Sequence, residues 1–271
     1  AANATVAYGV KFTPNASAVI GQWSFGAITW SNGVHNVRSP IAIKVVAPQL
    51  IVAPEVVAGT VPAKAGRVSF PVSMNYSGTT RTSMVGLTAP FGSSDVVSQD
   101  ADKSFSFNEA GLGFHTFLVP EGTRLVRFSL LEALADVAAA DLDMYVYRCI
   151  GYSCNAAGTS ANAGGNEEIT LLDPAPAADG AAGDFYLVFV HGYDLAGAEQ
   201  ANYTMPVWVV KDNAANYRIA ASPRAIEGRA NNVTLMTFNL AASPLPYLGV
   251  MSFKDGDGNE QATSLIQVTA K

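Results

Sequence analysis

The chain has 271 residues, of which 14% are charged, and its 22 acidic residues outnumber its 16 basic residues to give a formal net charge of −6. This balance argues against a nucleic-acid partner, which requires a clustered cationic face. No apolar run approaches the roughly 20 residues that span a bilayer, so we expect no membrane partner. The 24 glycines, the 14 prolines and many short runs of Val, Thr, Tyr and Phe predict an all-β fold of antiparallel β-sandwiches.

The first predicted elements are a strand at residues 1–11 and a β-hairpin at residues 23–46. In the hairpin, Gly26, Ile28 and Trp30 alternate with residues of the opposite face, as a half-buried strand requires. Asn32-Gly33 can adopt the positive φ angles of a type I′ turn, and apolar residues at 41, 43 and 45 resume the alternation. Because an isolated hairpin is only marginally stable, we expect this one to belong to a larger sandwich.

This hairpin also carries a family resemblance. The residues that carry it are Phe25-Gly26, Ile28-Thr29-Trp30-Ser31, Gly33, His35 and Val37-Arg38-Ser39-Pro40-Ile41-Ala42. They resemble the closing hairpin of the fibronectin-III-like domain behind the catalytic domain of many subtilisin-like (subtilase) serine proteases. Since a complete domain of this kind has about seven strands, we expect residues 1–47 to be its C-terminal half. The resemblance implies a catalytic domain that precedes Ala1.

Residues 48–95 contain the next three predicted strands, after a linker at residues 48–54. The stretch 67–76 alternates cleanly between apolar and polar residues, and the stretch 80–87 follows it after a turn. A polar break at residues 92–102 ends the group. This order is that of the first half of a sandwich.

From residue 103 the pattern changes, and residues 104–107, 115–119 and 123–131 are predicted as strands. The alanine-rich stretch 132–140 is either a helix or a loop that crosses between sheets. A second resemblance is carried by Asp141-Leu-Asp-Met-Tyr-Val-Tyr147, Glu167-Glu-Ile-Thr-Leu171, Asp184-Phe-Tyr-Leu-Val-Phe-Val-His-Gly-Tyr193 and Asn202-Tyr-Thr204. These segments resemble the bacterial pre-peptidase C-terminal domain, a jelly-roll-like sandwich appended to secreted proteases of several catalytic families. The resemblance covers about residues 103–212.

Residues 214–271 repeat the pattern of the first hairpin. The corresponding residues are Gly26 and Gly249, Trp30 and Phe253, Asn32-Gly33 and Asp255-Gly256, and Ile43-Lys44-Val45 and Ile266-Gln267-Val268. Such a repeat implies one supersecondary unit used twice. We therefore predict that residues 48–95 and 214–271 form a split fibronectin-III-like sandwich, into which residues 96–213 are inserted as the pre-peptidase-like sandwich. Three domains in a row are the alternative, which would leave the last segment without its first strands.

The two cysteines, Cys149 and Cys154, are separated by four residues within a predicted turn. This spacing suits a local disulfide, which is common in oxidising compartments. A structural zinc site usually needs four ligands, and neither another Cys nor a His lies nearby. We expect the disulfide and, with it, a secreted protein.

No catalytic residue is expected in this chain. The subtilisin resemblance prompts a search for its catalytic triad, but the sequence lacks the Asp, His and Ser motifs of that family. His191-Gly192 matches only the first two residues of the His motif, and the other histidines are His35 and His115. Scattered histidines are more often structural or surface groups, and a triad requires convergence in space.

Calcium is the one cofactor that the residues suggest, and the alternative is no cofactor. Asp141 and Asp143 alternate on a predicted strand, so their side chains project from one face. Together with Asp136, or with Asp184 and Asp194, they could supply an oxygen-rich calcium site. The plainer interpretation is a pair of solvent-facing aspartates at a strand start.

Aromatic residues could form a strip that binds carbohydrate or protein. The candidates are Trp23, Phe25, Tyr145, Tyr147, Tyr186, Tyr193 and Trp208. Aromatic residues at strand spacing usually belong to the core, so the decision depends on the face they occupy.

The leading hypothesis is a non-catalytic C-terminal accessory region of a secreted, bacterial subtilisin-like serine endopeptidase. Its partners would be the N-terminal catalytic domain, which it stabilises, and protein substrate, which it captures. The second hypothesis is a carbohydrate- or surface-binding β-sandwich module of another secreted hydrolase, which an exposed coplanar row of aromatic residues would favour. Because a sandwich scaffold does not define a function, the first hypothesis rests on the resemblance.

Overall fold

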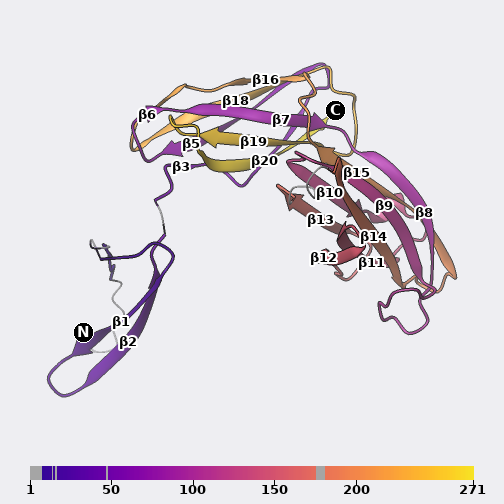
Figure 1. Ribbon diagram of the computed structural model, residues 1–271, viewed down its shortest axis with the longest axis horizontal. Helices are drawn as coiled ribbons and strands as arrows, with labels where there is room; N and C mark the ends of the chain where they lie inside the picture. Colours follow the sequence, from indigo (N-terminus) through magenta and orange to yellow (C-terminus); the bar gives the residue numbers. More distant parts are fainter. Residues whose placement is uncertain (1–7, 14, 16, 47, 175–180) are drawn as a thin grey trace. The chain divides into compact units, whose positions relative to one another are not determined.

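The computed structural model describes residues 8–13, 15, 17–46, 48–174 and 181–271 (Figure 1). Two compact units divide the chain, residues 1–49 and residues 50–271. Within the described residues, the regular structure is strand apart from one short 3₁₀ turn, and the strands form several sheets that are antiparallel apart from one parallel pair. The prediction of an all-β fold of antiparallel sheets is therefore confirmed. No helix of the described part is long and apolar enough to cross a membrane.

Residues 1–49 contain a two-stranded antiparallel sheet. Its strands are β1 (Trp23–Ser31) and β2 (Asn36–Lys44). They pair in continuous register, from Trp23 opposite Lys44 to Ser31 opposite Asn36. The predicted hairpin is therefore present, with its strands each nine residues long.

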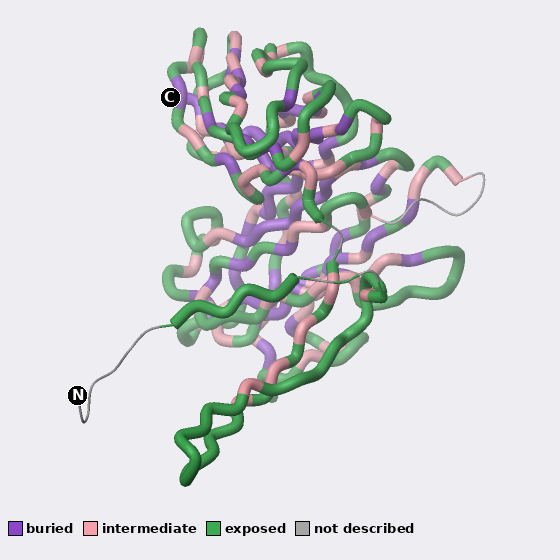
Figure 2. The backbone as a smooth tube through the Cα atoms, turned by 90° about the vertical axis from the view of Figure 1, so that its left-hand side faces the viewer, coloured by how far each residue is buried: buried purple, intermediate pink, exposed green. Residues whose placement is uncertain are grey.

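The two faces of this hairpin differ in their side chains. Because side chains alternate along a strand, Ile28 and Trp30 share one face with residues 37, 39, 41 and 43 of β2. We call this the inner face, and the half-buried positions 28, 39, 41 and 43 all belong to it. The opposite, outer face carries Trp23 and Phe25 and is exposed along its whole length. Most of the hairpin is accordingly green in Figure 2.

The turn of the hairpin differs from the predicted type I′ turn. Gly33 has φ of +86°, but Asn32 is not among the residues with positive φ, and a type I′ turn needs positive φ at both central positions. Instead, the Asn32 side-chain oxygen accepts hydrogen bonds from the backbone N–H groups of Val34 at 3.0 Å and His35 at 2.7 Å. The loop spans four residues, and the Asn32 side chain reverses the chain together with a backbone hydrogen bond from Asn32 N to His35 O at 3.3 Å.

The first sandwich of residues 50–271 is built from two separate stretches of chain. Its strands are β3 (Ile51–Val52), β4 (Val56–Val61), β5 (Ala65–Met74), β6 (Gly78–Thr79), β7 (Arg81–Thr88), β16 (Tyr217–Ala220), β17 (Arg224–Ala225), β18 (Arg229–Phe238), β19 (Tyr247–Lys254) and β20 (Glu260–Ala270). The two main sheets have the orders β16-β18-β5-β3 and β4-β20-β19-β7, and β6 pairs with β17. We call this unit the host sandwich. Phe70, Leu235, Phe253 and Ile266 lie in its core.

The second sandwich, which we call the inserted sandwich, is built from the residues in between. Its strands are β8 (Phe91–Ser98), β9 (Leu112–Pro120), β10 (Leu125–Leu130), β11 (Asp141–Ile150), β12 (Ser153–Ser160), β13 (Glu167–Leu172), β14 (Gly183–Asp194) and β15 (Gln200–Val210). Its sheets have the orders β13-β10-β15-β8 and β12-β11-β14-β9. Phe128, Met144, Val188 and Met205 lie in its core. In Figure 1, the purple and yellow strands of the host sandwich lie together, away from the magenta-to-brown inserted strands.

The chain passes between the two sandwiches twice, at residues 89–90 and 211–216. Backbone hydrogen bonds join the second crossing to β7, from Gly86 N to Asp212 O at 3.0 Å and from Ala214 N to Gly86 O at 2.8 Å. The predicted polar break at 92–102 contains a strand, because the polar side chains of β8 alternate at the edge of a sheet. The pairing of strands 51–88 with strands 217–270 supports the predicted split sandwich, whose boundaries stay a prediction.

The alanine-rich stretch 132–140 forms a loop. Only Glu132–Leu134 adopts a helical conformation, a single 3₁₀ turn that we label η1. The loop leads from β10 in one sheet of the inserted sandwich to β11 in the other. Of the two alternatives predicted for this stretch, the crossing loop is the one observed.

The host and inserted sandwiches share an apolar joint. It is formed by Leu125, Trp208 and Val210 of the inserted sandwich with Leu248, Val250 and Leu265 of the host sandwich. Trp208 is 2% exposed, and its indole N–H donates to the backbone oxygen of Pro246 at 2.9 Å. Beside this joint, the Arg124 guanidinium bridges Asp173 at 2.6 Å and Glu260 at 3.1 Å. Apolar burial and these polar contacts together fix one sandwich against the other.

Candidate functional site

A buried polar cluster of the inserted sandwich is centred on His191 in β14. The register places His191 opposite Asp143 of β11. Its Nδ1 lies 3.1 Å from Asp143 Oδ2, and its Nε2 lies 3.0 Å from Oδ2 of Asp100, which precedes β9. The hydrogen bond with His191 lowers the pKa of Asp100, whereas burial raises the pKa of Asp143. The imidazole therefore ties the segment before β9 to the face of the sheet.

Glu109 brings a third acidic group to this cluster. One ligand atom each of Asp100, Glu109 and His191 lies within 4.8 Å of the others. A histidine nitrogen with carboxylate oxygens is a donor set of zinc and other first-row metals. Here the donors already have protein partners, since Glu109 accepts from the Ser106 hydroxyl at 2.7 Å and Asp100 accepts from the Ser104 backbone N–H at 2.9 Å. We therefore treat the cluster as the anchor of the segment 100–111.

Aromatic rings cover this anchor. Phe105 stacks on Tyr145 of β11, with ring centroids 3.8 Å apart and an interplanar angle of 14°. Phe107 meets Tyr147 and Phe189 edge-on at 5.2 Å and 5.4 Å. Edge-to-face contacts of this kind satisfy the rings within the protein. The cluster is thus a packed cover for the sheet and lacks the flat row of rings that a sugar chain needs.

The predicted calcium ligands Asp141 and Asp143 line one cavity of about 340 Å³, together with Asn162 and Tyr193. Asp141 Oδ1 already accepts a hydrogen bond from the Gly164 backbone N–H at 3.0 Å, and Asp143 holds His191. The structure therefore brings these two aspartates together. The calcium site at Asp141 and Asp143 stays a prediction.

The other aspartates considered as calcium ligands have partners of their own. Asp136 accepts from the Asn202 side chain at 2.6 Å, and Asp194 pairs with Lys103 at 2.6 Å. Asp184 forms an ion pair with Arg148. None of the three lines the cavity of Asp141 and Asp143 among the described residues.

A serine and a histidine meet at the seam between β8 and β9. Ser93 Oγ lies 2.8 Å from His115 Nδ1, and the Tyr203 hydroxyl lies 2.8 Å from His115 Nε2. Burial lowers the pKa of His115 and raises that of Tyr203. A serine nucleophile needs a histidine that a carboxylate orients, but a tyrosine occupies that place. These three residues link β8 and β15 of one sheet to β9 of the other at the edge of the inserted sandwich.

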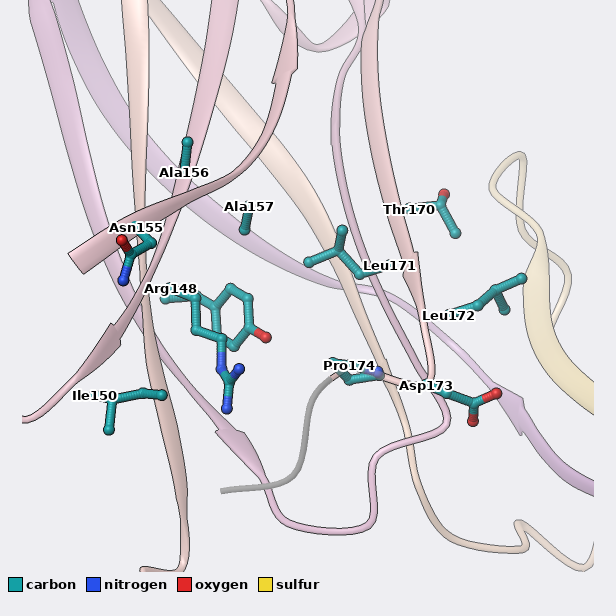
Figure 3. A pocket seen from close by; sticks show the side chains of 11 residues that line it. Arg148, Ile150, Asn155, Ala156, Ala157, Thr170, Leu171, Leu172, Asp173 and Pro174 are labelled. Atoms are coloured by element: carbon teal, nitrogen blue, oxygen red, sulfur yellow. The ribbon is translucent and has the colours of Figure 1, made fainter. Parts of the chain in front are cut away.

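A cavity of about 440 Å³ lies among residues of β11, β12, β13 and β14 (Figure 3). Arg148 and Tyr186 line it together with Leu171 and Leu172 of β13. The Arg148 Nε donates to Asp184 Oδ2 at 2.7 Å, so the guanidinium charge is paired within the protein. This pairing makes the cavity unsuited to an anion.

Cys149 and Cys154 form the predicted disulfide. They lie directly opposite each other in the register of β11 and β12 and close the turn between these strands. The sequence spacing was therefore a sufficient signal for this bond.

The aromatic candidates separate by exposure. Tyr186 and Trp208 are buried, and Tyr145 and Tyr147 are half-buried in the cover described above. The exposed ones are Trp23 at 58%, Phe25 at 80% and Tyr193 at 38%. Residues 104–107, which were predicted as a strand, lie outside the observed strands. Sequence reasoning missed the convergence of Asp100, Phe105 and Glu109 because these residues meet only through tertiary packing.

The comparisons with known proteins concern the N-terminus. A family model described as "Fibronectin type-III domain" matches residues 1–43. No curated protein matches the chain. The N-terminal segment is thus similar to a fibronectin type-III domain, which supports the fibronectin-III-like part of the resemblance.

Proposed function

We propose that the chain is a non-catalytic C-terminal accessory region of a secreted, bacterial subtilisin-like serine endopeptidase. The observation that carries the proposal is the hairpin of β1 and β2, whose sequence resembles the closing hairpin of that family's fibronectin-III-like domain. The fibronectin type-III match to residues 1–43 and the disulfide support it in a coarser sense.

The inner face of the hairpin indicates how the region would act. Trp30 is 48% exposed and Val37 is 62% exposed, although both occupy the inner face, which would turn toward the core in a complete sandwich. We propose that strands preceding Ala1 cover this face. Covering it would anchor the region to the catalytic domain and stabilise that domain.

The inserted sandwich would then be the pre-peptidase C-terminal-like domain. In support, the segments that carry the resemblance, 141–147 and 184–193, form the neighbouring strands β11 and β14. The proposed role of this sandwich is to capture protein substrate for the peptidase.

The test begins with the coding sequence immediately upstream of residue 1. The proposal expects the first strands of a fibronectin-III-like domain, preceded by a subtilisin nucleophile segment. An unrelated upstream domain would contradict it. With the longer protein in hand, deleting residues 1–271 should shorten the half-life of peptidase activity at elevated temperature, and the purified chain of 271 residues should not hydrolyse casein.

The alternative function is a carbohydrate- or surface-binding module of another secreted hydrolase. One observation favours it: Trp23 and Phe25 are both exposed on the outer face of the hairpin, with ring planes inclined by only 19°. A purely structural role would not require these two aromatic rings to be exposed, whereas a binding module would.

A further inference from the structure

The outer face of the β1–β2 hairpin presents two exposed aromatic rings whose planes are inclined by 19°. Trp23 and Phe25 are two residues apart on β1, and their ring centroids are 6.4 Å apart. Side chains around them are small, because Ala42 lies opposite Phe25, and Ala27 and Pro40 form the next pair on this face. The rings therefore stand on an open shelf without the walls of a pocket.

The same face is cationic. Lys44 lies opposite Trp23, and Arg38 lies opposite Thr29 further along the hairpin. The first 49 residues contain three basic residues and no acidic residue, whereas the remaining chain contains thirteen basic and twenty-two acidic residues. At about 3.4 Å per residue, Lys44 and Arg38 are spaced about 20 Å apart along β2. The face thus combines aromatic surface at one end with positive charge at both ends.

Completion of a sandwich would leave this face open. Each sheet of a sandwich has one face toward the core and one toward solvent. Strands that cover Trp30 and Val37 on the inner face would not contact Trp23 or Phe25. An exposed aromatic pair that sandwich formation does not bury indicates a binding surface.

We propose that the outer face of this hairpin binds an acidic, uronate-containing polysaccharide. The apolar C–H face of a pyranose ring packs against the Trp23 and Phe25 rings, and uronate carboxylates pair with Lys44 and Arg38. Several consecutive sugar units then lie along the hairpin. The inference deepens the binding-module alternative and is independent of the peptidase parentage.

An acidic peptide shares the charge but fits the shelf less well. Protein partners gain most of their affinity from side chains anchored in well-packed pockets, and the small neighbours Ala27, Pro40 and Ala42 provide no such pocket. Sugar rings need only a flat aromatic face. The chemistry of the shelf therefore favours the glycan.

The test is affinity electrophoresis of the full chain in native gels that contain polygalacturonate and a chelator. Because the protein is itself anionic, an anionic polymer retards it only by binding. We expect the unaltered chain to be retarded. Its affinity for polygalacturonate should fall about tenfold in Trp23→Ala and in Phe25→Ala. In Lys44→Ala the affinity should also fall, and it should depend less on salt. All three residues are exposed, so the variants should keep the fold, which far-ultraviolet circular dichroism will verify.

Two probes and two variants serve as controls. Fully methyl-esterified polygalacturonate keeps the sugar rings but lacks the carboxylate charge, so it should bind more weakly. Poly-glutamate keeps the carboxylate charge but lacks sugar rings, so it should not bind. Tyr152→Ala and Lys64→Ala remove an exposed ring and an exposed cation elsewhere and should not change the retardation. The proposal is overturned by no retardation at all, by retardation that survives both Trp23→Ala and Phe25→Ala, or by equal binding of poly-glutamate, which would indicate an acidic protein partner.

Discussion

The hairpins β1–β2 and β19–β20 share one sequence pattern but differ in their surroundings. Strand β19 pairs with β7 on its other side, and β20 pairs with β4, so the second hairpin lies inside a four-stranded sheet. Phe253 is 0% exposed, whereas Trp30 at the corresponding position is 48% exposed. The second hairpin also contributes Leu248 and Val250 to the joint with the inserted sandwich.

The comparison shows that the local sequence pattern determines which side chains share a face, whereas neighbouring strands determine whether that face is buried. Alternation of apolar and polar residues decides which side chains share a face, and both hairpins obey it. Burial of that face requires further strands and an opposing sheet. The first hairpin therefore has the pattern of a core element without the cover that the second hairpin has among the described residues.

The largest expected effect tests the difference directly. Phe253→Ala should destabilise the chain by about 3–5 kcal/mol, because Phe253 is fully buried and meets Phe70 edge-on at 6.4 Å. Trp30→Ala should cost less than about 1 kcal/mol, because half of the side chain already contacts solvent. Urea unfolding followed by circular dichroism measures both. Similar losses for the two variants would show that the first hairpin is as well covered as the second.

The second prediction concerns the apolar joint that packs the inserted sandwich against β19 and β20. Trp208→Ala should destabilise the chain by about 3 kcal/mol and split a single unfolding transition into two, because it removes the largest side chain of the apolar joint and its hydrogen bond to Pro246. Scanning calorimetry will show the number of transitions. Trp23→Ala is the matched control, since that tryptophan is 58% exposed and should leave the transition unchanged. A single, merely shifted transition in Trp208→Ala would mean that other contacts suffice to couple the sandwiches.

The contrast between local pattern and tertiary surroundings also explains which features could be predicted from the sequence. The hairpins, the all-β class and the disulfide depend on local period and spacing, which residues 23–45 and the pair Cys149 and Cys154 display directly. The cluster of Asp100, Glu109 and His191 depends on a loop that folds back over a sheet, and no periodicity marks it. The type I′ turn at Asn32 was predicted wrongly, because the dipeptide Asn-Gly does not reveal that the Asn32 side chain takes part in closing a four-residue loop.

A third hairpin, β11–β12, sharpens the comparison because it combines exposure with a covalent tie. Most residues of β12 are exposed, yet the disulfide holds its first residues to β11. Replacing Cys149 and Cys154 with Ser should destabilise the chain by about 2 kcal/mol, a modest value because the closed loop is short. Urea unfolding measures it, and reduction of the unaltered chain with dithiothreitol should give the same loss. An unchanged midpoint would mean that strand pairing alone holds this hairpin.

The smallest effect is expected from pH and compares a buried histidine with an exposed one. Burial lowers the pKa of His115, so below about pH 6.5 the unfolded chain binds a proton that the folded chain does not. Stability should therefore fall as the pH decreases from about 6.5 to the folded pKa, with a slope of at most about 1.4 kcal/mol per pH unit. His115→Gln should flatten this part of a urea-midpoint profile, while His35→Gln in the exposed turn should not. If both variants keep the full pH dependence of the urea midpoint, the loss of stability at low pH belongs to another titrating group. The contact of Ser93, His115 and Tyr203 would then not determine the stability of the chain at low pH.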